Sequence, residues 1–159
     1  MAVLGRAERR RGRAGTAYTR ILVPVVAGER GQLAVAVGCV LAAERHATVT
    51  ALVAIAVPAE LPLDAHMDEA EAQAARVLAA AQAVGERFGV TIVTRVVRAR
   101  AAGEAIVAEA AAADAEIVVV GAERQERSSK YAPLFGATVA FVLRHAPCRV
   151  VLATAGGAR

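Results

Sequence analysis

The stretch Ile117-Val118-Val119-Val120-Gly121 decides the fold class of this chain. Four consecutive branched apolar residues indicate a strand that is buried on both faces, as in a parallel sheet covered by helices. The glycine ends this strand in a turn, and a second glycine, Gly136, stands fifteen residues later near a helical pattern. Many α/β domains bind a phosphate with this succession of elements: a strand, a glycine turn, a loop and the start of a helix, whose backbone N–H groups surround the phosphate.

The same alternation of strands and helices extends over the rest of the chain. Further strands are predicted over 20–26, 48–57, 90–97 and 148–152, and helices over 33–46, 67–88, 103–110 and 134–145. Asp64 is the predicted N-cap of the second of these helices, and Gly89 the residue that ends it. Alternation with right-handed crossovers gives an α/β fold with a doubly wound, five-stranded parallel sheet. Its ligand crevice is expected at the carboxyl ends of the strands.

The composition indicates one domain with an aliphatic core. Of the 159 residues, 57% are hydrophobic and only 3% aromatic, so small and branched side chains must fill the interior. The longest run without a polar side chain, residues 33–43, is well short of the roughly 20 apolar residues needed to cross a bilayer. The arginines near the N-terminus are not followed by the apolar segment of a secretion signal. We therefore expect no membrane span and a cytoplasmic location.

The basic charge is concentrated at the N-terminus. Residues 1–20 carry six arginines and one glutamate, whereas the remaining 13 basic and 14 acidic residues sum to −1. We expect residues 1–19 to form a disordered basic arm, residues 20–154 the folded domain and residues 155–159 a flexible tail. No aromatic residue is interleaved among Arg6 to Arg13 to stack on bases, so a solvated arm is favoured over one that binds nucleic acid.

The cysteines and histidines give no support for metal binding or catalysis. Cys39 and Cys148 lie far apart in no metal-ligand spacing, so both are expected to be buried, reduced thiols. His46, His66 and His145 have no nucleophile or carboxylate at a catalytic spacing. His145 is instead expected to interact with the last carbonyl groups of its helix. We expect neither an enzyme nor a metal ion.

Residues 20–154 resemble the universal stress protein family. The family's signature runs strand, Gly, two residues, Gly, about nine residues, Gly, then Ser or Thr at a helix start that places N–H groups at a phosphate. Residues 117–151 largely follow this order, and residues 142–148 give the family-like sequence Val-Leu-Arg-His-Ala-Pro-Cys. The resemblance implies the universal-stress fold, which is of the adenine nucleotide alpha hydrolase-like type, with strand order 3-2-1-4-5. It also implies a pocket for an adenine nucleotide such as ATP or AMP.

The resemblance assigns this pocket residue by residue. The implied nucleotide contacts are Pro24, Val25, Val26, Ile55, Gly121, Ala122, Arg124, Gly136, Ala137 and Thr138. Three of them depart from the family's pattern: Val26 replaces an Asp that contacts adenosine, Arg124 replaces a glycine, and Ala137 replaces Ser or Thr. An arginine at position 124 has the donors to bind a phosphate instead. The resemblance therefore implies a degenerate pocket.

Two functions remain open on these residues. One is a regulatory domain that binds an adenine nucleotide, which Gly121, Gly136 and the basic residues between 124 and 130 favour. The other is a nucleotide-free interaction module of the same fold, which the three departures favour. Residues 61–64 and 98–106 further resemble the version of the domain appended to amino-acid permeases, which implies a transporter as a partner protein.

The last strand is the candidate dimer interface. In the family it lies at the edge of the sheet and commonly mediates homodimerisation. An exposed apolar edge strand invites pairing with a second copy about a two-fold axis. The candidate interface residues are Arg149, Val150, Val151 and Leu152.

Overall fold

The computed structural model describes residues 18–123 and 135–156. Most of the predicted arm, part of the predicted tail, and Arg124 lie outside these residues. Strands and helices alternate along the described chain: β1 (Arg20–Pro24), α2 (Glu29–Ala43), β2 (Thr48–Ala56), α3 (Asp68–Arg87), β3 (Ile92–Ala99), α4 (Ala102–Ala112), β4 (Ile117–Gly121), α5 (Ala137–His145) and β5 (Arg149–Ala153).

The strands form one five-stranded sheet in the order β3-β2-β1-β4-β5, with all neighbours parallel. This confirms the predicted fold class and the strand order that the resemblance implied. The ladder between β1 and β4 joins only Ile21 to Ile117 and Leu22 to Val118, and it stops before either strand ends. The winding direction reverses between these two strands, which is where α/β sheets open a crevice.

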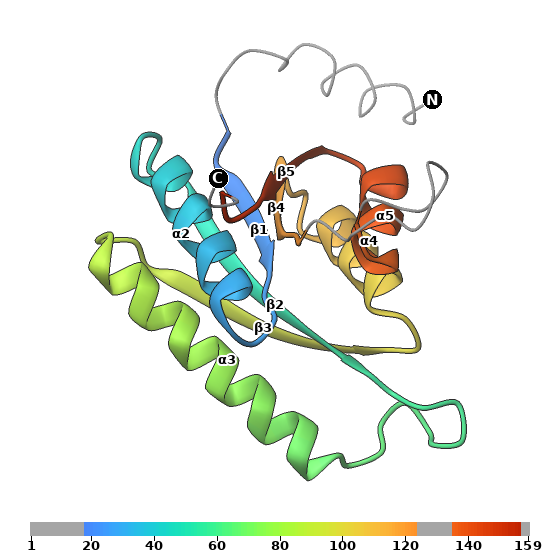
Figure 1. The fold of residues 1–159 in the computed structure, drawn as a ribbon. Coiled ribbons are helices and arrows are strands. Elements are labelled where there is room, and N and C mark those ends of the chain that lie inside the picture. Colours follow the sequence, from blue (N-terminus) through green and yellow to red (C-terminus); the bar gives the residue numbers. More distant parts are fainter. Residues whose placement is uncertain (1–17, 124–134, 157–159) are drawn as a thin grey trace, which may run out of the picture.

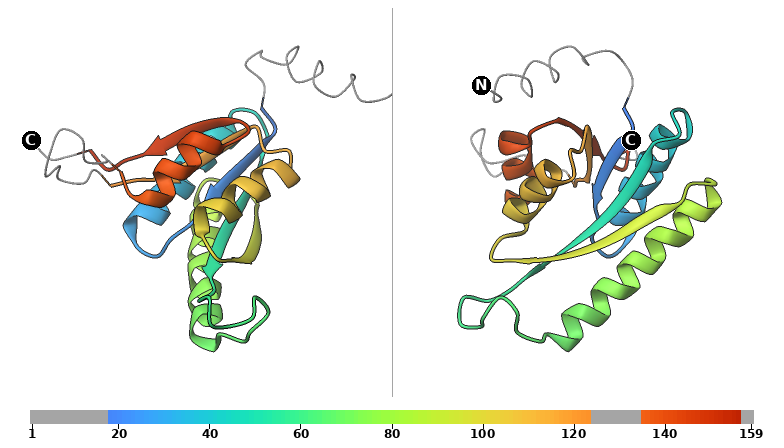
Figure 2. Two further views of the ribbon diagram at one scale, coloured as in Figure 1. Left: turned by 90° about the vertical axis from the view of Figure 1, so that its right-hand side faces the viewer. Right: turned by 180° about the vertical axis from the view of Figure 1, so that it is seen from behind.

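Two helices cover each face of the sheet, as Figures 1 and 2 show: α2 and α3 lie on one face, and α4 and α5 on the other. Alternation along β1 sends Ile21 and Val23 into the core beneath α2 and α3, and Leu22 into the core beneath α4 and α5. The continuous apolar runs in β1 and β4 are therefore explained by burial on both faces. Within the described ranges, no helix is long and apolar enough to cross a membrane.

The start of α3 differs from the prediction. Asp64 is not its N-cap, because residues 58–65 form two successive turns in which Leu61 N–H donates to Pro58 O and Ala65 N–H to Pro62 O. Met67 occupies the N-cap position, and its backbone N–H donates to Glu71 Oε1 at 3.2 Å. This hydrogen bond, together with the contact from the Arg98 guanidinium, lowers the pKa of Glu71. Glu71, in the first turn, thus reaches back to the N-cap residue, while the N-cap side chain itself makes no capping hydrogen bond.

The first turn of α2 packs so closely on the sheet that two positions require glycine. A Cβ atom on Gly31 would lie 1.8 Å from the Val26 carbonyl oxygen, and one on Gly121 would lie 2.5 Å from the Arg30 carbonyl oxygen. Both obstacles are backbone atoms, which cannot rotate aside as a side chain does. The packing of β4 against α2 is therefore sufficient to explain why a glycine stands at position 121, at the end of the stretch 117–121.

A carboxylate at the start of β4 fixes the start of β1. Glu116 Oε2 accepts hydrogen bonds from the backbone N–H groups of Thr19, at 2.6 Å, and Arg20, at 3.1 Å. The Arg20 guanidinium lies 3.5 Å from Glu116 Oε1. Burial raises the pKa of Glu116, but the hydrogen bonds and the nearby cation outweigh it, so the pKa is lowered overall. The folded state favours the charged carboxylate.

We predict that Glu116→Gln lowers the free energy of unfolding by about 1–2 kcal/mol at neutral pH, because a charged acceptor of two N–H groups becomes a neutral one. Since the folded-state pKa is lowered, the wild-type advantage is present above the unfolded-state pKa and is lost as the pH falls through the folded-state pKa. Urea unfolding of both proteins over a pH series measures the difference, with the exposed Glu60→Gln as control. A difference that does not change with pH would contradict this role of the charge.

Candidate functional site

A cavity of about 390 Å³ opens at the carboxyl ends of β1, β2 and β4. Leu52 and Val120 contribute apolar side chains from the strands, and Ile106 closes the side formed by α4. The first turns of α2 and α5 complete the lining. The cavity therefore lies at the switch point between β1 and β4, where the ladder between these strands has already ended.

The cavity brings together most of the residues that the resemblance assigned to a nucleotide. Those in its lining are Pro24, Val25, Val26, Gly121, Gly136, Ala137 and Thr138. Ala122 follows directly after β4, but its side chain is buried in the core beneath α4 and α5. Arg124 lies outside the described residues. Segments that are more than 90 positions apart in the sequence, at β1 and α5, thus meet at one site.

Ile55 lies outside this cavity. Its side chain packs with Val57 and with Ala74 of α3, on the opposite face of the sheet. The contribution of β2 to the cavity comes from Leu52 and Ala54 instead. Because neighbouring side chains of a strand point to opposite faces, an assignment that is wrong by one position moves a residue from one face to the other.

The N-terminus of α5 faces the cavity with no side-chain cap. Gly136 is its N-cap, and no side-chain hydrogen bond is made there. Ala137 and Thr138, the first two helical residues, line the cavity. The first N–H groups of a helix have no partner within the helix, and together with the helix dipole they make such a terminus favourable for an anion. Gly136 has φ −61° and ψ 165°, an extended conformation open to any residue, so its backbone does not require glycine.

Arg30 and Glu123 are the charged side chains of the lining, as far as the structure describes it. Arg30 comes from the first turn of α2, and Glu123 follows β4. An Arg30 guanidinium nitrogen lies 3.9 Å from Glu123 Oε2, and the two side chains are 40% and 76% exposed. An exposed pair at this distance contributes little to stability, because water screens it.

Arg30 was missed in the sequence because the helix was expected to start at Leu33. It begins at Glu29, directly after the turn, so residues assigned to the connection belong to the first helical turn. One signal in the sequence could have identified Arg30. It lies shortly after the first strand, at the edge of the sheet where ligands bind in folds of this class.

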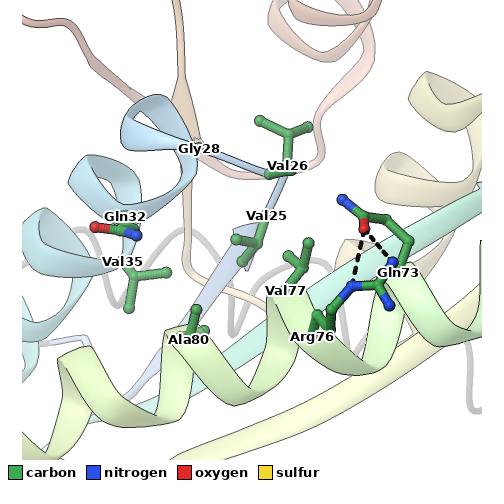
Figure 3. A pocket seen from close by; sticks show the side chains of 11 residues that line it. Val25, Val26, Gly28, Gln32, Val35, Gln73, Arg76, Val77 and Ala80 are labelled. Carbon is green, nitrogen blue, oxygen red and sulfur yellow. Dashed lines mark hydrogen bonds between the residues drawn. The ribbon is translucent and has the colours of Figure 1, made fainter.

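A second cavity, of about 230 Å³, lies on the other face of the sheet between α2 and α3 (Figure 3). Val35 and Val77 give it an apolar floor, while Gln73 and Arg76 stand on α3 at its rim. Arg76 donates through Nε and Nη2 to Gln73 Oε1, at 3.2 and 2.8 Å. Of the residues assigned to a nucleotide, this cavity contains only Val25 and Val26, both of which also line the first cavity. The first cavity is the better candidate site because it contains these two and five more.

The residues expected to be structural differ in their surroundings. Cys39 is buried as predicted, and its burial raises the pKa of the thiol, whereas Cys148 was predicted to be buried but is only half-buried. His145 Nδ1 lies 2.9 Å from the Phe141 carbonyl oxygen, which confirms its predicted interaction at the end of its helix. Across residues 18–123 and 135–156, no group of three or more His, Cys, Asp or Glu is arranged to bind a metal ion.

Comparisons with known proteins agree with this architecture. The model of the universal stress protein family matches residues 17–154. A universal stress protein from Archaeoglobus fulgidus is 20% identical with a TM-score of 0.72, over 85% of this chain and 98% of that chain. A universal stress protein in complex with cAMP is 22% identical with a TM-score of 0.68, over 86% and 97%.

An Archaeoglobus fulgidus universal stress protein in complex with dAMP is 18% identical with a TM-score of 0.67, over 85% of this chain and 97% of that chain. No curated protein sequence gives a significant match. At these identities the structural likeness shows the fold alone. The family model, by contrast, covers all of the described residues except the last two. The chain belongs to the universal stress protein family.

Proposed function

We propose that this chain is a cytoplasmic regulatory domain that binds an adenine nucleotide in the cavity at the ends of β1, β2 and β4. One observation carries the proposal: the uncapped N-terminus of α5 and the end of β1 line the same cavity. The start of α5 offers N–H groups to a phosphate, and the end of β1 lies where the resemblance places adenosine. Ligand exchange would act by changing the shape of the domain or its affinity for a partner, without catalysis.

The size and lining of the cavity support this ligand class. Its volume of about 390 Å³ lies within the range of roughly 300–1,000 Å³ that is usual for small-molecule sites. Leu52, Ile106 and Val120 offer aliphatic surface to a base, and Thr138 offers a hydroxyl group near the helix start. Two of the similar universal stress proteins were solved with cAMP and with dAMP, which are adenine nucleotides.

We propose that the site is degenerate relative to the family's pattern. Val26 occupies the place of the family's aspartate, and its side chain is 44% exposed at the edge of the cavity. Ala137 occupies the place of a hydroxyl residue at the start of α5. Both changes remove hydrogen-bonding groups while leaving space and backbone donors in place. We therefore expect nucleotide binding that is weaker than in members that retain these groups.

We predict that Val26→Asp tightens binding of AMP and ATP by about tenfold, which corresponds to one added hydrogen bond of about 1.4 kcal/mol. The position is exposed enough to accept a carboxylate without a burial cost. Isothermal titration calorimetry of the full chain measures the change. Val40→Asp, at a similarly exposed valine of α2 outside the cavity, is the control. Equal affinities in both variants and in the wild type would count against adenosine at Val26.

We predict that Gly136→Val weakens nucleotide binding by at least about tenfold, because a branched side chain obstructs the approach of a phosphate to the α5 N–H groups. The extended backbone at Gly136 accepts valine, so thermal unfolding should change little. Titration calorimetry and a thermal melt on the same sample separate the two effects. An unchanged affinity would show that the phosphate is not bound at α5.

We also propose that the chain is a homodimer through β5. This strand lies at the end of the sheet order, where one backbone edge faces away from β4. Val150, Val151 and Leu152 are half-buried in the single chain, while Arg149 is exposed. Pairing of two β5 edges about a two-fold axis would cover these apolar residues.

One observation favours a second function, a nucleotide-free interaction module that serves a partner protein such as a membrane transporter. Arg30 and Glu123 face each other and neutralise the described charge of the cavity, and Val26 leaves its edge apolar.

A native mass spectrum of the purified chain, before and after addition of ATP, separates the two functions. We expect a dimer that carries the mass of an adenine nucleotide. A dimer that stays empty would favour the interaction module, and a monomer would contradict pairing through β5.

A further inference from the structure

We propose that Arg30 is the side chain through which the cavity distinguishes a phosphorylated ligand from an uncharged one. Its guanidinium faces Glu123, and a ligand phosphate would replace this carboxylate as its partner. The inference rests on the proposed function, because it assigns the anion-recognising side chain of the same cavity.

The backbone of Arg30 is held in place by the packing of α2 on the sheet. Its carbonyl oxygen and its Cγ atom lie 2.5 and 2.8 Å from the point where a Cβ of Gly121 would be. Next to it, a Cβ atom on Gly31 would lie only 1.8 Å from the Val26 carbonyl oxygen. The base of the side chain is therefore fixed against the ends of β1 and β4. The guanidinium group is the part that remains free to reorient at the cavity.

The contact between Arg30 and Glu123 is weak enough to be exchanged. Its 3.9 Å separation exceeds the roughly 2.7–2.9 Å of a charge-assisted hydrogen bond. Both side chains are substantially exposed, so water already solvates each charge. A phosphate group offers several oxygens, which a planar guanidinium binds in a bidentate manner. The exchange therefore replaces a long, screened contact with short ones.

The remaining described lining does not compete for the anion. Apart from Arg30 and Glu123, it consists of apolar residues, glycines and Thr138. The N–H groups at the start of α5 attract an anion to the same cavity. Glu123 then has two effects on a nucleotide: it competes with the phosphate for Arg30, and it repels the incoming charge. Removing this carboxylate should favour phosphorylated ligands.

The test is a calorimetric titration of the full chain with adenosine, AMP and ATP. Arg30→Gln keeps the aliphatic stem against Gly121 but removes the charge, and we expect about a tenfold loss of affinity for AMP and ATP. Glu123→Gln should raise the affinity for AMP and ATP severalfold. Adenosine should bind all three proteins equally. Arg76→Gln, at the rim of the other cavity, is the matched control and should bind all ligands as the wild type does.

The outcomes separate this inference from the proposed function. If Arg30→Gln binds AMP as tightly as the wild type, the inference is overturned while nucleotide binding stands. If the variant loses adenosine and AMP equally, Arg30 supports the structure of the site and recognises no phosphate. A loss of AMP affinity in Glu123→Gln would show that Glu123 positions Arg30, which also overturns the exchange. If no ligand binds any of these proteins or Val26→Asp, both proposals fail.

Discussion

The close packing of the first turn of α2 against the ends of β1 and β4 is the constraint on which the rest of the structure depends. Two backbone carbonyl groups, those of Val26 and Arg30, occupy the space that side chains at Gly31 and Gly121 would need. Glycine at both positions lets the helix approach until it forms a wall of the main cavity. A side chain at either position would move α2 outward and change the shape of the site together with the stability of the domain.

The cavity beside this turn is lined mainly by backbone and aliphatic side chains. Leu52, Ile106 and Val120 line it from two elements, and the start of α5 adds N–H groups. Polar side chains contribute little, since the described charges face each other at 3.9 Å. The described lining thus offers the N–H groups at the start of α5 but few polar side chains. That combination is consistent both with weak nucleotide binding and with a module that has become independent of nucleotides.

The sequence was sufficient to predict the fold, because the signals for it are distributed and redundant. Continuous apolar runs identified β1 and β4, and strict alternation of elements identified the parallel sheet. The site was predictable only in part. Ile55 was placed in the cavity although Leu52 and Ala54 line it, because the face of a strand depends on a single register position.

Helix starts were the weakest part of the prediction, since they depend on local turns that composition does not reveal. Asp64 resembles a cap but lies inside a turn closed by Pro62 and Ala65. The early start of α2 hid Arg30 for the same reason. Both errors concern only one or two turns of the chain. The second error nevertheless kept Arg30, the cation in the described lining of the cavity, out of the predicted site.

Val25 and Val26 contribute to the lining of both cavities, which lie on opposite faces of the sheet. This segment is tied to the sheet through the hydrogen bond from Val25 N–H to Leu52 O, at 2.8 Å. Because the same two residues line both cavities, a substitution at Val25 or Val26 changes the walls of both at once.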